Sequence, residues 1–121
     1  MTAREFYAGF RDVFPRQWTY DGSSGPWEDG YVRLMLEVVD VLIARLESTS
    51  EVQTFCRFVA HGIKEADPEL LQGICAGLIP HLQMSIAFRF RDQAMYTEKK
   101  ALIYPFLCSD AQREWDHWEA A

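Results

Sequence analysis

The chain has 121 residues, of which 49% are hydrophobic and 25% charged, and this composition excludes disorder over the full length. The length suits one domain with a core of its own. The net charge of −6, from 12 basic and 18 acidic residues, argues against a protein built to grip nucleic-acid phosphates.

The N-terminal residues predict a short amphipathic helix. Thr2 and Glu5 have the spacing of a capping box, in which a hydroxyl and an acid three residues later satisfy the first backbone N–H groups. The apolar stripe that follows comprises Phe6, Phe10, Val13 and Phe14. Pro15 ends this helix. Residues 15–30 then predict an irregular loop, because 21–26 (DGSSGP) is typical turn sequence.

The segment from Gly30 to Glu47 is strongly apolar, and its valines and isoleucines make a strand the obvious alternative. Its polar residues favour a helix instead, because they recur at helical intervals on one narrow stripe. These residues are Arg33, Glu37, Asp40 and Glu47. A helix with so narrow a polar stripe must be covered on most sides. We therefore expect it to be the central helix of the domain.

Two helices are predicted next, and their short connection favours antiparallel packing. Ser50 and Gln53 form a second capping-box pattern, and Asp67 with Pro68 begins the second of the two helices. The first helix has an apolar stripe of Val52, Phe55, Cys56, Val59 and Ile63. The second has a stripe of Leu71, Ile74, Cys75, Leu78 and Leu82.

The second helix of this pair contains one proline and two glycines that are expected to affect its geometry and packing. Pro80 is expected to kink or end it near Ile79, because proline lacks the backbone N–H that a helix interior uses. Gly73 and Gly77 are four residues apart and are expected to let a neighbour approach closely.

The C-terminal third is also predicted to be mostly helical. Residues 86–91 alternate enough to permit a short strand, but no second convincing strand exists to pair with it. Met95 to Leu107 is predicted to be helical, with Pro105 bending or ending it. Its expected apolar side comprises Met95, Ala101, Leu102 and Phe106. Ser109 and Gln112 form a third capping-box pattern before a last short helix. We therefore predict an all-α single domain, 1–121, built as a bundle of about five or six helices.

The residue types that carry chemistry do not form a recognisable catalytic or metal-binding pattern. Cys56 and His61 are five residues apart, so on a helix they diverge by about 140°. Glu114, Asp116 and His117 are near neighbours on a helix and point in different directions. We expect no enzyme activity, no cofactor and no metal. The three cysteines are expected to be free thiols, and Cys56 and Cys75 to act as small buried hydrophobes.

The sequence shows no signal peptide, and its most apolar window, Leu70 to Phe90, is interrupted by polar residues and a proline. These interruptions are Gln72, Pro80, His81 and Gln83. We therefore expect a cytoplasmic protein that does not cross a membrane.

Two groups of aromatic and acidic residues are the best candidates for a binding surface. One lies in the loop before Tyr31 and the other near the C-terminus. Tryptophan and tyrosine are enriched at interface hot spots, and flanking carboxylates would steer a basic partner. The candidate contacts are Trp27, Glu28, Asp29, Trp115, Asp116 and Trp118. The alternative is that these aromatic residues simply close the core.

The stretch from Asp29 to Leu82 resembles small helical immunity proteins of bacterial polymorphic-toxin systems. The resemblance lies in an irregular aromatic segment, a long apolar helix and a series of short motifs. These motifs are 42–46 (LIARL), 50–52 (SEV), 55–59 (FCRFV), 67–71 (DPELL) and 77–82 (GLIPHL). It implies a cytoplasmic protein that binds and blocks one cognate toxin, and it implies no catalytic residues.

Our expectation from the sequence is therefore an immunity or antitoxin-type protein that occludes a cognate toxin, with a basic partner such as a nuclease suited to the net charge. The alternative is a helical adaptor or a subunit of a larger complex. Homo-oligomerisation through the face of Gly73 and Gly77 or through the terminal tryptophans stays open.

Overall fold

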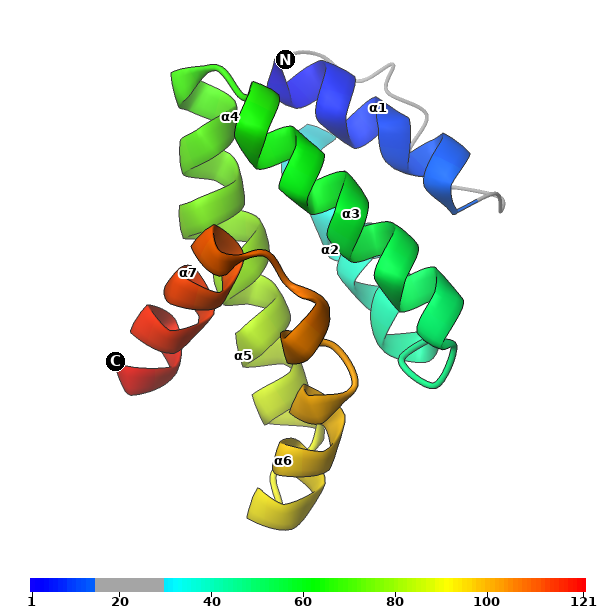
Figure 1. Cartoon of the computed structure of the whole chain (residues 1–121), viewed down its shortest axis with the longest axis vertical. Coiled ribbons are helices and arrows are strands. Elements are labelled where there is room, and N and C mark those ends of the chain that lie inside the picture. The colour runs from blue at the N-terminus through cyan, green and yellow to red at the C-terminus, as the bar shows by residue number, and fades with distance from the viewer. Residues whose placement is uncertain (15–29) are drawn as a thin grey trace.

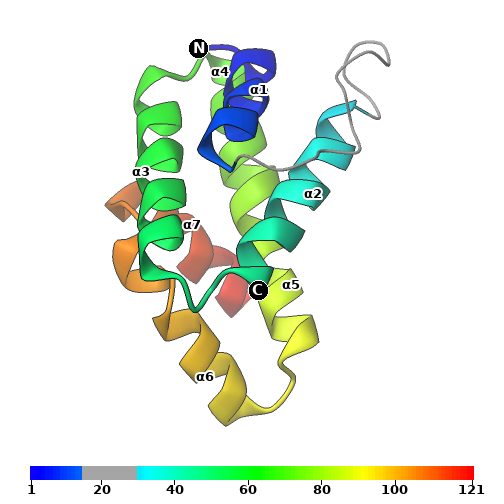
Figure 2. The same cartoon turned by 90° about the vertical axis from the view of Figure 1, so that its right-hand side faces the viewer.

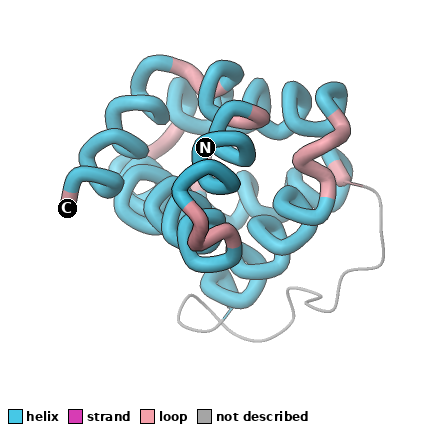
Figure 3. The backbone as a smooth tube through the Cα atoms, turned by 90° about the horizontal axis from the view of Figure 1, so that it is seen from below, coloured by secondary structure: helices cyan, strands magenta, loops and turns pink. Residues whose placement is uncertain are grey.

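The structure, a computed structural model, describes residues 1–14 and 30–121, without the side chains of Arg11 and residues 30–34. All regular structure in these residues is helical, as Figure 3 shows, so the predicted all-α fold is confirmed. The first helices are α1 (Ala3–Val13), α2 (Gly30–Ala44) and α3 (Thr49–Glu65). One unbroken helix follows, made of α4 (Pro68–Gly73), a π-helical turn (Ile74–Leu78) and α5 (Ile79–Arg89). The chain ends with α6 (Gln93–Ala101), a 3₁₀ turn (Tyr104–Phe106) and α7 (Ser109–Ala120).

The central element of this part of the chain is the unbroken helix Pro68–Arg89 rather than α2. Its α4 portion contacts α1 and α3, and its α5 portion contacts α2, α6 and α7. Figures 1 and 2 show it between the group formed by α1, α2 and α3 and the C-terminal helix α7. Among the described side chains of α2, Val38, Val39, Val41 and Leu42 are buried but Leu36 is exposed, so this helix is covered only in part and is not central.

A cluster of phenylalanines joins α1 to α3. Phe6 stacks on Phe58 with ring centroids 5.0 Å apart, and Phe10 meets the same ring edge-on at 4.7 Å. Glycines on both helices make room for these rings. A Cβ atom at Gly9 would lie 2.5 Å from Phe58 Cζ, and one at Gly62 would overlap the Phe6 ring. These glycines, rather than Gly73 and Gly77, are the close-packed ones, since Gly73 has no such neighbour within 4 Å.

Helix starts were predicted correctly where the capping side chain is anchored. The Thr2 hydroxyl accepts from the Glu5 N–H at 3.2 Å, and the Glu5 carboxylate accepts from the Thr2 N–H at 3.1 Å. Asp67 accepts from the Leu70 N–H at 2.8 Å.

The two other capping-box predictions are wrong. The N-cap residue of α3 is Ser48 rather than Ser50, and that of α7 is Cys108 rather than Ser109. Neither cap makes a side-chain hydrogen bond. In both places the N-cap precedes the serine that carried the pattern, by two residues in α3 and by one in α7.

Pro80 does not end its helix, because the π-helical turn before it accommodates the ring. In this turn the Ile79 N–H bonds to the Ile74 carbonyl, five residues back, so the backbone is wider just where the proline ring would otherwise meet a carbonyl. The helix then continues to Arg89, and residues 86–89 are helical rather than a strand. Leu70, and not Leu71, is buried at the start of the helix.

The predicted helix from Met95 to Leu107 is shorter than expected. Regular α-helix ends at Ala101, and Pro105 lies in the 3₁₀ turn that follows. The expected apolar side is also wrong, because Met95 and Phe106 are exposed while Ile103 and Leu107 are buried.

The helix Pro68–Arg89 is, by length and composition alone, apolar enough to cross a membrane. Much of this helix is instead covered within the bundle. Its fully buried side chains are Leu70, Ile74, Leu78, Ile79, Leu82 and Ile86. The core helix of a bundle satisfies the same criterion, so the finding is weak evidence for a membrane span.

Candidate functional site

The C-terminal aromatic and acidic segment lies on α7, which packs against α5 and the π-helical turn. Trp115 is fully buried on its inner side, with the ring of Tyr104 edge-on to it at 6.1 Å. Ala111, one turn earlier, is buried on the same side. Trp115 therefore belongs to the core and has no exposed surface to offer a partner.

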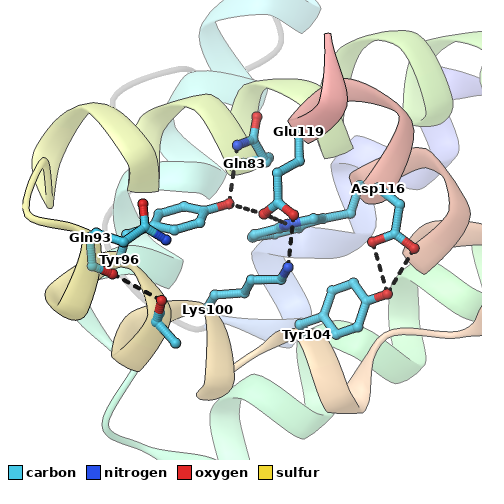
Figure 4. Close-up of polar contacts among 9 residues, drawn as sticks. Gln83, Gln93, Tyr96, Lys100, Tyr104, Asp116 and Glu119 are labelled. Atoms are coloured by element: carbon cyan, nitrogen blue, oxygen red, sulfur yellow. Dashed lines mark hydrogen bonds and ion pairs between the residues drawn. The ribbon is translucent and has the colours of Figure 1, made fainter.

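The carboxylate of Glu119 fastens the end of α7 to α5 and α6 (Figure 4). It accepts hydrogen bonds from the Tyr96 hydroxyl, from Lys100 Nζ at 2.9 Å and from Trp115 Nε1 at 3.1 Å. Gln83 of α5 extends the network by donating to the Tyr96 hydroxyl at 3.1 Å. Two of these donors belong to α6 and therefore fix the end of α7 against that helix.

The electrostatics of this network favour an ionised Glu119. Partial burial works to raise the pKa of Glu119, but hydrogen bonds from Tyr96, Lys100 and Trp115 outweigh it, and the net effect lowers the pKa. The pKa of Tyr96 is raised, chiefly by burial. Tyr96 therefore stays a neutral donor next to a charged acceptor.

Asp116 is held by a separate contact on the outer side of the helix. The Tyr104 hydroxyl donates to both of its carboxylate oxygens, at 2.9 and 3.0 Å, and this interaction raises the pKa of Tyr104. Tyr104 is fixed in turn, because Gln112 Nε2 donates to its backbone carbonyl at 2.9 Å and Lys100 Nζ lies 4.8 Å from its ring centroid. The exposed Asp116 carboxylate is thus kept in one position.

Trp118 is the second aromatic residue of the segment, and it is half-buried. The exposed ring of His117 meets it edge-on, with centroids 5.4 Å apart. Its indole N–H is buried and has no hydrogen-bond acceptor among the described residues. Asp116 and Trp118 are two residues apart and therefore lie on opposite flanks of α7, with the exposed His117 between them. We term this exposed surface the outer face of α7.

The structure therefore separates the predicted contact residues. Asp116 and Trp118 lie on the outer face of α7, whereas Trp115 lies in the core. Trp27, Glu28 and Asp29 lie outside the described residues.

Sequence reasoning missed the residues that support this face, above all Tyr96, Lys100 and Tyr104. They lie 12 to 23 residues from their acidic partners. No local spacing in the sequence could have indicated these pairings.

The other groups that could carry chemistry do not extend this face into a reactive site. Burial raises the pKa of the Cys56 thiol to about 12 and also raises that of Cys75, so both thiols are poor nucleophiles. Within the described ranges, no three histidine, cysteine, aspartate or glutamate side chains gather as metal ligands. The arrangement around α7 is suited to binding a partner through a fixed carboxylate and a tryptophan.

No protein-family model, curated protein or solved structure matches the chain. The residues of this face and the resemblance seen in the sequence are therefore the basis for a proposed function.

Proposed function

We propose that the protein is an immunity or antitoxin-type inhibitor, which binds one cognate toxin in the cytoplasm and occludes its active site. The observation that carries this proposal is the outer face of α7, which has a carboxylate fixed by Tyr104 on one flank and a half-buried tryptophan on the other. The protein acts in this proposal by binding alone, without a catalytic residue or a cofactor.

The charge of α7 supports a basic partner. The helix contains four acidic residues and one arginine, and the whole chain has a net charge of −6. Complementary charge of this kind raises the rate of association and selects against acidic proteins. A toxin that acts on nucleic acid presents the required basic surface, because it must itself bind phosphates.

The rigidity of the face supports tight binding. Glu119 holds α7 through two donors of α6, and Asp116 is held by Tyr104, so little side-chain freedom is lost when a partner docks. Tryptophans at such positions frequently contribute a large share of interface energy. A preformed face of this type suits a protein whose single task is to occlude another.

The test begins with purification of the tagged chain from its own cells and identification of a protein that elutes with it at equal stoichiometry. That protein is then expressed alone and together with the chain. An inhibitor requires that the partner be toxic alone and harmless in the complex. A partner without toxicity would contradict the proposal and favour an adaptor or a subunit of a larger assembly.

Substitutions on α7 then test the face itself. Asp116→Lys is expected to weaken the complex about tenfold or more, chiefly through slower association, and Trp118→Ala through faster dissociation. The matched control is Glu98→Lys, because Glu98 is an exposed acid of α6. Equal effects of Asp116→Lys and Glu98→Lys would refute the outer face of α7 as the binding site, even if the toxin were confirmed.

A further inference from the structure

The three cysteines of the chain are far apart in the sequence, but the fold gathers the elements that carry them. Cys56 lies on α3, Cys75 is the second residue of the π-helical turn and Cys108 is the N-cap residue of α7. The 3₁₀ turn that precedes Cys108 contacts α3, and α7 contacts the π-helical turn. In Figure 1 the chain between the 3₁₀ turn and α7 runs between α3 and the helix Pro68–Arg89. Cys108 therefore lies between the elements that carry the other two thiols.

The helical period places Cys108 on the side of α7 that meets the π-helical turn. Ala111 and Trp115, three and seven residues later, are buried on the side that packs against α5 and this turn. Residues at these spacings share one side of a helix, so Cys108 begins the same inner stripe, and it packs against the core. Cα atoms of α7 and of the π-helical turn lie within 8 Å of each other, close to the separation of about 4.4–6.8 Å that a disulfide spans.

The electrostatics of the thiols agree with this placement. Burial raises the pKa of Cys75, and nearby negative charges raise it further. These charges belong to Glu114, Asp110 and Cys108. Burial raises the pKa of Cys56 to about 12, and the charge of Cys108 again contributes. Because only a nearby charge acts on a pKa in this way, Cys108 is close to both of the other thiols.

Accessibility selects Cys75 as the partner of Cys108. Cys56 is only 2% exposed and lies in the core, whereas Cys75 and Cys108 are both partly exposed. A small oxidant can therefore reach these two thiols while the chain stays folded. Cys108 makes no side-chain cap hydrogen bond that would have to break before it reacts.

We propose that Cys75 and Cys108 form a reversible disulfide that locks the start of α7 to the π-helical turn under oxidising conditions. The oxidant is a low-molecular-weight disulfide such as glutathione disulfide. In the first step the Cys108 thiolate attacks one of its sulfurs, so that a mixed disulfide forms and one glutathione thiolate leaves. In the second step Cys75 gives its proton to water and its sulfur attacks Cys108 Sγ, so that the second glutathione thiolate leaves. The protein loses two electrons and two protons, and glutathione disulfide takes them up as two thiols.

The order of the two steps follows from the surroundings of Cys75. Its raised pKa keeps it protonated near neutral pH, so it reacts slowly with a free oxidant. Once Cys108 carries the mixed disulfide, the attack by Cys75 is intramolecular, and the high local concentration compensates for the small thiolate fraction. Excess thiol reverses both steps, so the bond is transient in a reducing compartment. The proposal does not rest on toxin inhibition, although the locked helix is the one that carries the outer face of α7.

Treatment of the folded chain with glutathione disulfide, followed by mass spectrometry, tests the proposal. The unmodified chain should lose about 2 Da, and peptide mapping without reductant should recover two peptides joined through Cys75 and Cys108. Cys75→Ser should stop at a glutathione adduct on Cys108, whereas Cys108→Ser should gain little adduct at Cys75. Cys56→Ala is the matched control and should form the bond as the unmodified chain does. Circular dichroism confirms the fold of each variant.

The oxidised chain should also be harder to unfold. The bond closes the loop between the two cysteines and so restricts the unfolded chain, and the Tm should rise by roughly 5–10 °C. Dithiothreitol should reverse this rise in the unmodified chain and should leave the Tm of Cys75→Ser unchanged.

Several results would overturn the proposal. A chain that accumulates glutathione adducts without an internal bond would show that Cys75 and Cys108 do not reach each other. A bond through Cys56, or disulfide-linked dimers as the main product, would contradict the pairing. An internal bond that leaves the Tm unchanged or lowers it would refute the lock on α7. These assays contain no toxin, so their failure leaves the proposed inhibition untouched, and a harmless partner protein would likewise leave the disulfide standing.

Discussion

Two glycine-to-alanine substitutions test the packing of α1 on α3. Alanine in a helix interior is more favourable than glycine by about 0.5–1 kcal/mol. At Gly73 the new Cβ atom would meet none of the surrounding atoms within 4 Å. Gly73→Ala should therefore stabilise the protein by about this full amount.

At Gly62 the same substitution has no free space. The new Cβ atom would overlap the ring of Phe6, which is fully buried. This ring cannot turn away easily, because it stacks on Phe58 and meets Phe10 edge-on, with centroids 5.0 Å apart in each case. Overpacking of a close-packed core costs about 1–3 kcal/mol. After subtraction of the helix gain, Gly62→Ala should destabilise the fold by about 1–2 kcal/mol.

Urea unfolding followed by far-ultraviolet circular dichroism measures both variants against the unmodified chain. The slope of the free energy of unfolding with urea should stay the same, so that the midpoints report stability directly. The two variants should differ by about 2–3 kcal/mol, and each 1 kcal/mol corresponds to roughly 3–5 °C in Tm for a chain of this size. If Gly62→Ala is as stable as Gly73→Ala, Phe6 does not pack against Gly62 and the described arrangement of α1 on α3 is refuted.

Three further substitutions or treatments test the caps, the network around Glu119 and the buried thiol. Asp67→Ala should lower the free energy of unfolding in urea by about 1 kcal/mol, because a capping hydrogen bond is lost. Ser48→Ala removes no side-chain cap bond and should leave the stability almost unchanged, so equal losses in the two variants would contradict the assignment of the caps. Glu119→Gln should destabilise the fold by about 1 kcal/mol near neutral pH, since the ionised carboxylate loses its charge-assisted hydrogen bonds at a partly exposed site. Folding lowers the pKa of Glu119 below its usual 4.5, so the stability that its carboxylate contributes is complete above pH 4.5 and is lost as the pH falls through the lowered pKa. The unmodified chain and Glu119→Gln should therefore become equally stable in acid, and a constant difference in stability down to pH 3 would exclude the ionised carboxylate as its cause. Cys56, whose pKa is raised to about 12 by burial, should resist a thiol reagent near neutral pH until urea unfolds the chain, and rapid labelling of the native protein, located by peptide mass mapping, would show that Cys56 is not buried.

The parts of the fold that depend on neighbouring residues were predictable from the sequence. The cap at Thr2 involves a residue only three positions away, and the stripe of Phe6, Phe10 and Phe14 follows from the helical period alone. Both signals are local, and both are confirmed. The ring of Phe58 lay outside the predicted stripe of α3, and Gly9 makes room for it, while Gly62 makes room for Phe6. This contact depends on how the side chains of α1 fit those of α3, and it produces no periodic pattern in the sequence of either helix.

The buried side of the helix Pro68–Arg89 was mispredicted because the sequence analysis did not foresee its π-helical turn. Pro80 predicts a kink or an end, but the π-helical turn before it inserts extra backbone and lets the helix continue. The same turn shifts the residues before it around the helix axis, so that Leu70 is buried where Leu71 was expected. The capping-box pattern at Ser50 failed for a different reason. Three consecutive residues with hydroxyl groups, Ser48 to Ser50, can each begin a helix, and the packing of α3 selected the first.

The candidate site shows the limit of composition as a guide. Trp115 and Trp118 are three residues apart and share the same acidic neighbours, yet one is fully buried and the other is half-exposed. The distinction arises from the packing of α7 on α5, which turns Ala111 and Trp115 inwards, and in this orientation Glu119 accepts hydrogen bonds from Tyr96 and Lys100 of α6. Composition therefore drew attention to the segment, while contacts over long stretches of sequence determined which of its residues are buried and which are exposed. A surface that binds tightly needs both kinds, because an exposed carboxylate and tryptophan gain affinity only when the helix that carries them is already fixed.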